Sequence, residues 1–135
     1  MARNLVAFFI LALLVVALEA PVLAHHAVSA EFDRNKPVSF TGTVKKVEWM
    51  NPHIYTHIEA KDASGKMVNW EIELGAPAIL LRNGWTKKAI TIGETVTVNG
   101  SLAKDGSNLA NATSVTLADG KKVFVGSSGD SGETK

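Results

Sequence analysis

Apolar and polar residues alternate along much of the chain, and a period of two residues predicts β-strands. In the first such stretch, apolar side chains occupy even positions up to Val44 and odd positions from Val47 onward. A slip of one residue within a strand predicts a β-bulge, and Gly42 in the same strand predicts a sharp bend. We therefore expect a kinked first strand that begins at Pro37.

A second strand follows the dipeptide Asn51-Pro52, which predicts a turn because proline disfavours the helical region for the residue before it. Beyond this turn, successive side chains point to opposite faces of the strand. One face carries apolar or small residues, namely Ile54, Thr56, Ile58 and Ala60. The other face holds two of the chain's four histidines and consists of His53, Tyr55, His57 and Glu59.

A turn at residues 62–65 joins this strand to a third and predicts a β-hairpin. Because like faces pair across a hairpin, we expect a register with residues 62–64 near the apex. This register places Glu73 opposite His53, Glu71 opposite Tyr55 and Asn69 opposite His57. His53, at the entrance of its strand and across from a carboxylate, is thus the better-placed histidine.

The period changes after the third strand, where Pro77, an apolar run and Asn83-Gly84 predict one short helix of about two turns. Further strands are predicted at 95–103, 109–117 and 122–125. This order predicts a mainly β protein, an OB-fold-like Greek-key barrel of five to six strands with one short helix between strands 3 and 4. An immunoglobulin-like sandwich fits less well, because it needs about seven strands and no such helix.

Residues 1–24 have the pattern of a secretory signal peptide. Arg3 supplies the positive end, and Leu5–Leu18 is an unbroken apolar run of 14 residues. Val22 and Ala24 provide the small-residue pattern that precedes a cleavage site. The run is shorter than the roughly 20 residues of a membrane span, so an uncleaved anchor is the weaker alternative.

Cleavage after Ala24 predicts a periplasmic or secreted bacterial protein whose first residue is His25. The remaining 111 of the 135 residues suit one domain, at 25–125, followed by a Gly- and Ser-rich tail at 126–135 that we expect to be disordered. A net charge of +1 without a massed basic patch predicts binding to neither nucleic acid nor, after cleavage, membranes. The absence of cysteine excludes disulfides, thiolate metal sites and iron–sulfur clusters.

The four histidines form two clusters, His25-His26 and the pair His53 and His57, and this clustering suggests a metal site. His53 and His57 cannot easily share one ion, because about 13 Å of strand separates them and a metal–nitrogen bond is about 2 Å. A mature N-terminal His25 is a better chelator, since its α-amine and imidazole close a ring on one metal. A third imidazole completes a T-shaped nitrogen set that resembles the histidine brace of secreted copper proteins, and copper suits such nitrogen ligands best.

We therefore expect a copper site built from four residues, His25, His26, His53 and Glu73. His53 is the expected third nitrogen, while His26 competes for that role because it would give a purely local site with His25. Three more residues are expected to face a ligand, namely Tyr55, His57 and Glu71. The plain alternatives are a solvated histidine pair at the N-terminus and an ordinary surface residue at His57.

The order of short motifs resembles a family of small secreted bacterial proteins that carry a domain of unknown function. The motifs are His25-His26, Glu31-Phe32-Asp33, Gly42-Thr43-Val44, Asn51-Pro52-His53, Trp70 with Glu73, and Arg82-Asn83-Gly84-Trp85. They extend over nearly the whole mature chain. The resemblance implies no activity, but it implies that His25, His26, His53 and Glu73 belong to the family pattern.

These patterns favour an exported copper-binding or copper-delivery protein whose partners are a metal ion and another periplasmic protein. The first alternative is a non-metal OB-fold module that binds an oligosaccharide, peptide or partner protein through the face bearing Tyr55 and His57. The second is a copper-dependent oxidase. It is less favoured because so short a chain leaves little surface for a substrate beside the metal. No catalytic residues are assigned, since no triad, phosphate loop or metalloprotease motif is present, and an enzyme is the less favoured class.

Overall fold

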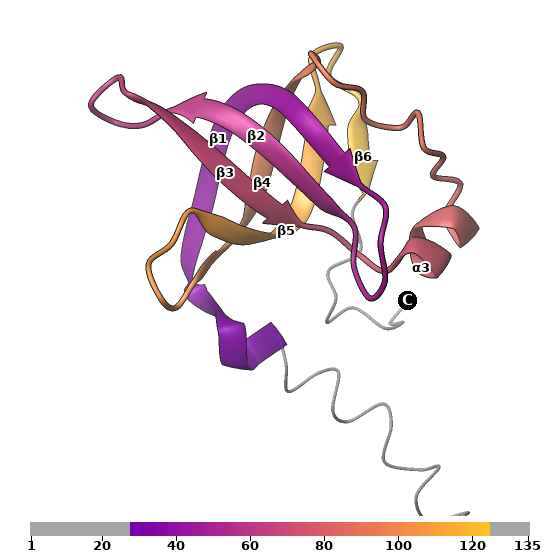
Figure 1. Cartoon of the computed structure of the whole chain (residues 1–135), viewed down its shortest axis with the longest axis horizontal. Helices are drawn as coiled ribbons and strands as arrows, with labels where there is room; N and C mark the ends of the chain where they lie inside the picture. Colours follow the sequence, from indigo (N-terminus) through magenta and orange to yellow (C-terminus); the bar gives the residue numbers. More distant parts are fainter. Residues whose placement is uncertain (1–27, 125–135) are drawn as a thin grey trace, which may run out of the picture.

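The computed structural model describes residues 28–124, so the predicted signal peptide, His25, His26 and the predicted tail at 126–135 lie outside the described residues. The described chain is mainly β, as the alternation predicted, and a helical turn at residues 28–31 precedes its first strand (Figure 1). The elements are β1 (Phe32–Glu48), β2 (Tyr55–Lys61), β3 (Met67–Glu73), α3 (Pro77–Arg82), β4 (Thr95–Ala103), β5 (Leu109–Leu117) and β6 (Lys122–Phe124).

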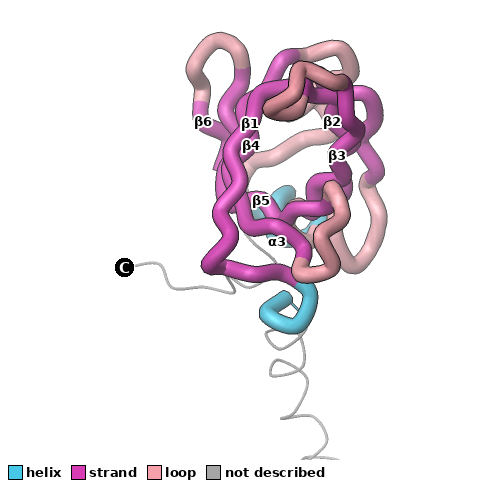
Figure 2. Tube along the Cα trace, turned by 90° about the vertical axis from the view of Figure 1, so that its left-hand side faces the viewer, coloured by secondary structure: helices cyan, strands magenta, loops and turns pink. Residues whose placement is uncertain are grey.

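Five of the strands form a closed ring. Neighbours in the order β3-β2-β1-β4-β5-β6 are hydrogen-bonded and antiparallel. β3 also pairs in parallel with β5, through Glu71–Glu73 and Leu109–Asn111, and this pairing closes the ring. Figure 2 shows the strands around a common interior, which a cluster of buried apolar side chains fills.

β1 is the strand that departs most from a regular ladder. Its pairing with β2 shifts between Val44 and Lys46, and this irregularity confirms the bulge predicted from the change of phase. The prediction that the strand begins at Pro37 was wrong, because β1 begins at Phe32. The exposed residues 34–36 look like a turn in the sequence, but they form an irregularity in the pairing with β4 between Asp33 and Pro37.

Gly42 allows β1 and β2 to approach each other closely. A Cβ atom at this position would lie 2.6 Å from the carbonyl oxygen of Glu59 and 2.6 Å from the Cγ2 atom of Ile58. Real Cβ atoms do not approach their neighbours so closely, so any larger residue would push β2 away. The sequence predicted a bend at this glycine, and the close approach of the neighbouring strand gives a further reason for it.

The interior of the ring is almost entirely apolar. Trp85, from the loop after α3, is 8% exposed and belongs to this core. Trp70 is only half-buried and stacks on Phe40, with ring centroids 4.6 Å apart. Thr56 is the polar exception, because it is 1% exposed and its hydroxyl has no hydrogen-bond partner among the described residues.

A second, smaller apolar cluster lies where the helical turn meets β4 and β5. Val28, Phe32 and Ala103 are buried together, and Leu109 packs against them. The backbone N–H of Lys104 donates to the carbonyl oxygen of Glu31 over 2.8 Å, and its side-chain Nζ donates to that of Ser29. These contacts fasten the start of the described chain to the hairpin between β4 and β5.

Candidate functional site

The hairpin of β2 and β3 exists, but its register differs from the predicted one by two residues. Tyr55 lies opposite Glu73 and His57 lies opposite Glu71, so the predicted pairings of these residues were wrong. The cause lies in the turn. Asp62 Oδ1 accepts hydrogen bonds from the backbone N–H groups of Ser64 and Lys66, which centres the turn one residue later than expected.

The shift leaves each side chain on its predicted face, because a displacement of two residues preserves the alternation. His53 therefore still reaches Glu73, from the loop just before β2, and its Nδ1 lies 3.2 Å from Glu73 Oε1. At this distance the ring and the carboxylate are in direct polar contact. The ring is 24% exposed, and its Nε2 has no hydrogen-bond partner among residues 28–124.

Glu73 is the centre of a buried polar network. Its carboxylate is only 3% exposed, and it accepts hydrogen bonds from side chains on two neighbouring strands. The Tyr55 hydroxyl donates to Oε2 over 3.1 Å, and Asn111 Nδ2 donates to Oε1 over 3.2 Å. These two hydrogen bonds satisfy the requirement that a buried charge be hydrogen-bonded, and His53 Nδ1 adds a polar contact at 3.2 Å.

The strand pairings explain why these residues meet. Tyr55 pairs with Glu73 across β2 and β3, and Glu73 pairs with Asn111 across β3 and β5. The three therefore form one row across three strands at the place where the ring closes. Gly100 on β4 helps to position the row, because a Cβ atom there would collide with the carbonyl oxygen of Asn111.

The network and the helical turn are coupled electrostatically. Burial, followed by the charge and hydrogen bond of Glu73, raises the pKa of Tyr55 to about 12. Partial burial raises the pKa of Glu31, the nearby carboxylates Glu73 and Asp105 raise it further, and His53 lowers it. Glu31 is therefore held within electrostatic range of the network, although its side chain is exposed.

His57 has a different partner. Its Nε2 lies 2.5 Å from Glu48 Oε2, and the second oxygen of Glu48 lies 2.6 Å from Lys46 Nζ. The side chain of Glu48 is 32% exposed, so solvent screens this pair. The Lys46 hydrogen bond, and then that of His57, hold the pKa of Glu48 below its ordinary value.

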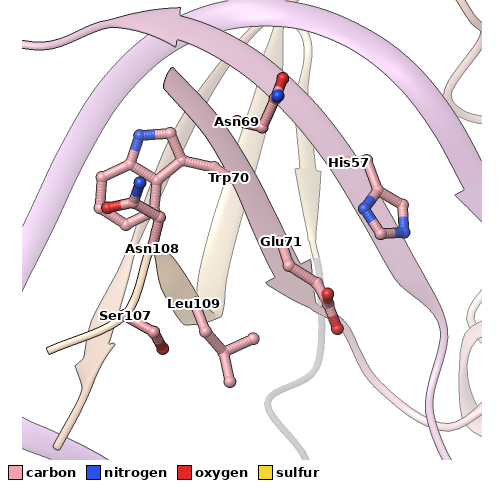
Figure 3. Close-up of a pocket in the computed structure, with 7 residues that line it drawn as sticks. All are labelled: His57, Asn69, Trp70, Glu71, Ser107, Asn108 and Leu109. Carbon is pink, nitrogen blue, oxygen red and sulfur yellow. The ribbon is translucent and has the colours of Figure 1, made fainter. Parts of the chain in front are cut away.

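An open groove of about 360 Å³ lies beside β3, on the side where β3 meets β5. The residues that line it are His57, Asn69, Trp70, Glu71, Ser107, Asn108 and Leu109. In Figure 3, Trp70 and Asn108 lie to one side of β3, whereas Glu71 and His57 lie to the other. Two of the three residues predicted to face a ligand, His57 and Glu71, thus line the groove, and the third, Tyr55, belongs to the Glu73 network.

Within residues 28–124, no three side chains of His, Asp or Glu gather closely enough to hold a metal ion. Of the four predicted metal-site residues, His53 and Glu73 lie within the described residues, and the structure brings these two together. In the same part of the chain, no helix is long and apolar enough to cross a membrane.

Two residues near His53 were absent from the predicted site. Asn111 reads as an ordinary strand position, because its meeting with Glu73 depends on the parallel pairing of β3 with β5, which has no local signal. Glu31 did have a signal, since it belongs to the motif Glu31-Phe32-Asp33 on which the family resemblance rests. No chemical role could be given to it until the turn was seen to lie near His53.

The comparison with protein families identifies the chain. A model described as a family of unknown function, DUF6152, matches residues 12–112. The chain belongs to the DUF6152 family. No protein with a curated description matches it significantly. The family assignment agrees with the resemblance seen in the motifs and brings no activity with it.

Proposed function

We propose that this DUF6152 protein is an exported copper-binding protein whose site combines His53 with the N-terminal residues His25 and His26. The observation that carries the proposal is the 3.2 Å contact between His53 Nδ1 and Oε1 of the buried Glu73 carboxylate. Metal-bound histidines commonly donate their second ring N–H to a carboxylate, which fixes the tautomer and the direction of the coordinating nitrogen. His53 has its Nδ1 beside such a carboxylate, and its Nε2 is left to bind a metal.

Glu73 acts beside the metal in this proposal, as the group that orients His53. Its Oε1 accepts from Asn111 and lies 3.2 Å from His53 Nδ1, and its Oε2 accepts from Tyr55. A carboxylate held on both oxygens is a rigid hydrogen-bond acceptor. Turning it to coordinate an ion would break contacts that are buried.

The remaining ligands are assigned to the N-terminal histidines. Val28 is buried in the small apolar cluster, and Glu31, one helical turn later, lies in electrostatic range of His53. Val28 is three positions after His25 in the sequence, a span of at most about 11 Å. The predicted cleavage after Ala24 would free the α-amine of His25, so that amine and imidazole together chelate one ion. Copper remains the expected metal because all of these donors are nitrogens.

The scaffold in this proposal is an OB-like barrel. Support comes from the closed ring of five strands, from the parallel contact between β3 and β5, and from the position of α3 between β3 and β4. The irregular β1, which pairs with both β2 and β4, matches the kinked first strand of such barrels. A rigid ring would keep His53 and Glu73 in place while the N-terminal segment binds the ion.

The test is copper binding by the mature protein, followed by electron paramagnetic resonance. Protein that begins at His25 should bind one Cu(II), and His53→Ala should remove one nitrogen from the spectrum. His57→Ala is the matched control, because His57 lies on the same strand and is paired with Glu48 instead. Adding one glycine before His25 should weaken or remodel the site, since the chelating amine becomes an amide.

Two results would overturn the proposal. If the glycine extension leaves affinity and spectrum unchanged, the N-terminal amine is not a ligand. If His53→Ala leaves the spectrum unchanged while the extension alters it, copper is held locally by His25 and His26, and His53 has no part in the site.

A further inference from the structure

The groove beside β3 contains an unpaired stretch of sheet edge. β3 spans Met67–Glu73, but its pairing with β5 covers only Glu71–Glu73. At the boundary, the N–H of Glu71 donates to the carbonyl oxygen of Asn108 over 2.9 Å. Because backbone groups alternate in direction along a strand, the N–H and C=O of Asn69 point the same way as those of Glu71. Among the described residues, these two groups of Asn69 have no partner.

An unpaired edge next to a groove suits an extended peptide. The free edge runs from Met67 to Asn69, a length of about 10 Å, which matches roughly three residues of a strand. Trp70 and Leu109 offer apolar contacts there, and the side chains of Asn69, Asn108 and Ser107 offer hydrogen bonds. An added strand would obtain affinity from the backbone of Asn69 and selectivity from these side chains.

The charge of the groove indicates which peptides it favours. Glu71 is exposed in its lining, and the lining contains neither Lys nor Arg. Further carboxylates lie nearby, since Glu31 experiences the charges of both Glu71 and Asp105. A cationic side chain on the added strand would therefore be attracted to this end of the groove.

We propose that the edge of β3 at Met67–Asn69 binds an extended, lysine- or arginine-containing peptide segment by strand addition. The peptide backbone pairs with the N–H and C=O of Asn69, and a cationic side chain reaches Glu71. This site is separate from the copper site of the proposed function, because it requires neither His53 nor the N-terminal histidines.

The occupant is a single peptide rather than a second copy of the chain. The loop before β5 contributes Ser107 and Asn108 to the groove and bounds it on one side. The open edge of β3 is therefore short. One strand can enter such a space, whereas the edge of a second sheet would meet the loop. An oligosaccharide would use Trp70 and the amide side chains, but it would not pair with the backbone N–H and C=O of Asn69 as a strand does.

The probe is a blocked pentapeptide in which Val and Lys alternate, titrated into isotopically labelled full-length protein and followed by nuclear magnetic resonance. The backbone amide of Asn69 and the indole of Trp70 should shift together. The same peptide with N-methylated interior residues should bind at least about tenfold more weakly, because it cannot donate backbone hydrogen bonds. A peptide with Glu in place of Lys should also bind more weakly, and the difference should shrink in high salt.

Protein variants separate the backbone contact from the side-chain contacts. Asn69→Pro removes the N–H that faces the groove and should reduce affinity about tenfold, whereas Asn69→Ala keeps it and should stay within about threefold. Glu71→Gln should remove the preference for Lys over Glu peptides. Glu94→Gln is its control, because Glu94 lies in the turn before β4, where its carboxylate accepts hydrogen bonds from Thr91, and it does not line the groove.

Three outcomes would overturn the proposal. The first is an N-methylated peptide that binds as well as its parent, which would mean that side chains alone make the contact. The second is a chitotriose titration that shifts Asn69 and Trp70 when no peptide does. The third is concentration-dependent dimerisation that shifts the Asn69 amide without any peptide. If Asn69→Pro does not fold, the N-methylated peptide still decides the question.

Discussion

Two histidines, His53 and His57, lie four residues apart on one face of the same chain segment, and each is paired with a carboxylate. The partner of His53 is Glu73, which is 3% exposed and is also held by Tyr55 and Asn111. The partner of His57 is Glu48, whose side chain is 32% exposed and which also contacts Lys46. The His57 contact is the shorter, at 2.5 Å against 3.2 Å for His53, but the carboxylate that contacts His53 is far more deeply buried.

The difference shows what turns a histidine–carboxylate pair into a candidate site. A buried carboxylate that accepts from several donors has one orientation, so it restricts the ring that lies against it. An exposed pair is screened by water and salt, and its side chains can exchange partners at little cost. His53 is therefore held with a nitrogen available, whereas His57 is an ordinary member of a surface ion-pair group.

The largest expected effect comes from removing the buried carboxylate. Glu73→Ala should lower the free energy of unfolding by about 3 kcal/mol, because it removes the acceptor of the Tyr55 and Asn111 hydrogen bonds and the buried partner of His53. Urea denaturation of the metal-free protein measures the loss. Glu48→Ala is the matched control and should leave the midpoint of unfolding unchanged within error. Equal losses for both variants would show that the two pairs do not differ in the way described.

The second prediction concerns the hydroxyl that donates to Glu73. The chain has a single tyrosine, so the ultraviolet absorbance of phenolate reports Tyr55 alone. Its titration should have a midpoint at about 12, compared with an ordinary pKa of about 10. Because the pKa is raised in the folded state, the stabilising contribution is present below pH about 10 and is lost as the pH rises towards 12.

Glu73→Gln provides the control for that titration. Removing the charge of Glu73 should lower the titration midpoint of Tyr55, while the part of the pKa increase that is due to burial remains. A midpoint near the ordinary value in folded wild-type protein would mean that the hydroxyl faces water and that the row of Tyr55, Glu73 and Asn111 is not formed.

Local patterns in the sequence were sufficient for most of the strands. The alternation and turn residues predicted β4 and β5 at their observed bounds, and the change of phase located the bulge after Val44. They failed where structure depends on contacts distant in sequence. The polar residues 34–36 look like a turn, yet they lie within β1, which pairs with β4 on both sides of them.

The same limit applies to the candidate site. The pairing of His53 with Glu73 could be predicted because both lie in one hairpin, and an error of two residues in register did not separate them. The contribution of Asn111 could not be predicted, since it depends on the closure of the ring by β3 and β5. The open edge of β3 was missed for the same reason, because an unpaired edge is defined by where the neighbouring strand ends.

The smallest expected effect is a gain in stability when the carboxylate nearest to His53 on the helical turn is neutralised. Burial and the repulsion of Glu73 and Asp105 raise the pKa of Glu31, so its ionisation at neutral pH opposes folding. The protonated form of Glu31 makes its full contribution to stability at pH values below the ordinary pKa of Glu. This contribution is lost as the pH rises through the raised pKa of the folded protein. Because Glu31 is exposed, solvent screens these repulsions, so Glu31→Gln in metal-free protein should raise the free energy of unfolding at pH 7 by less than about 0.5 kcal/mol, with no gain below pH about 4. Glu59→Gln should show no such gain, because Glu59 Oε2 is paired with Lys45 Nζ at 2.8 Å. A loss of stability for Glu31→Gln at neutral pH would mean that the turn is held by an attraction to His53 that outweighs the two carboxylates.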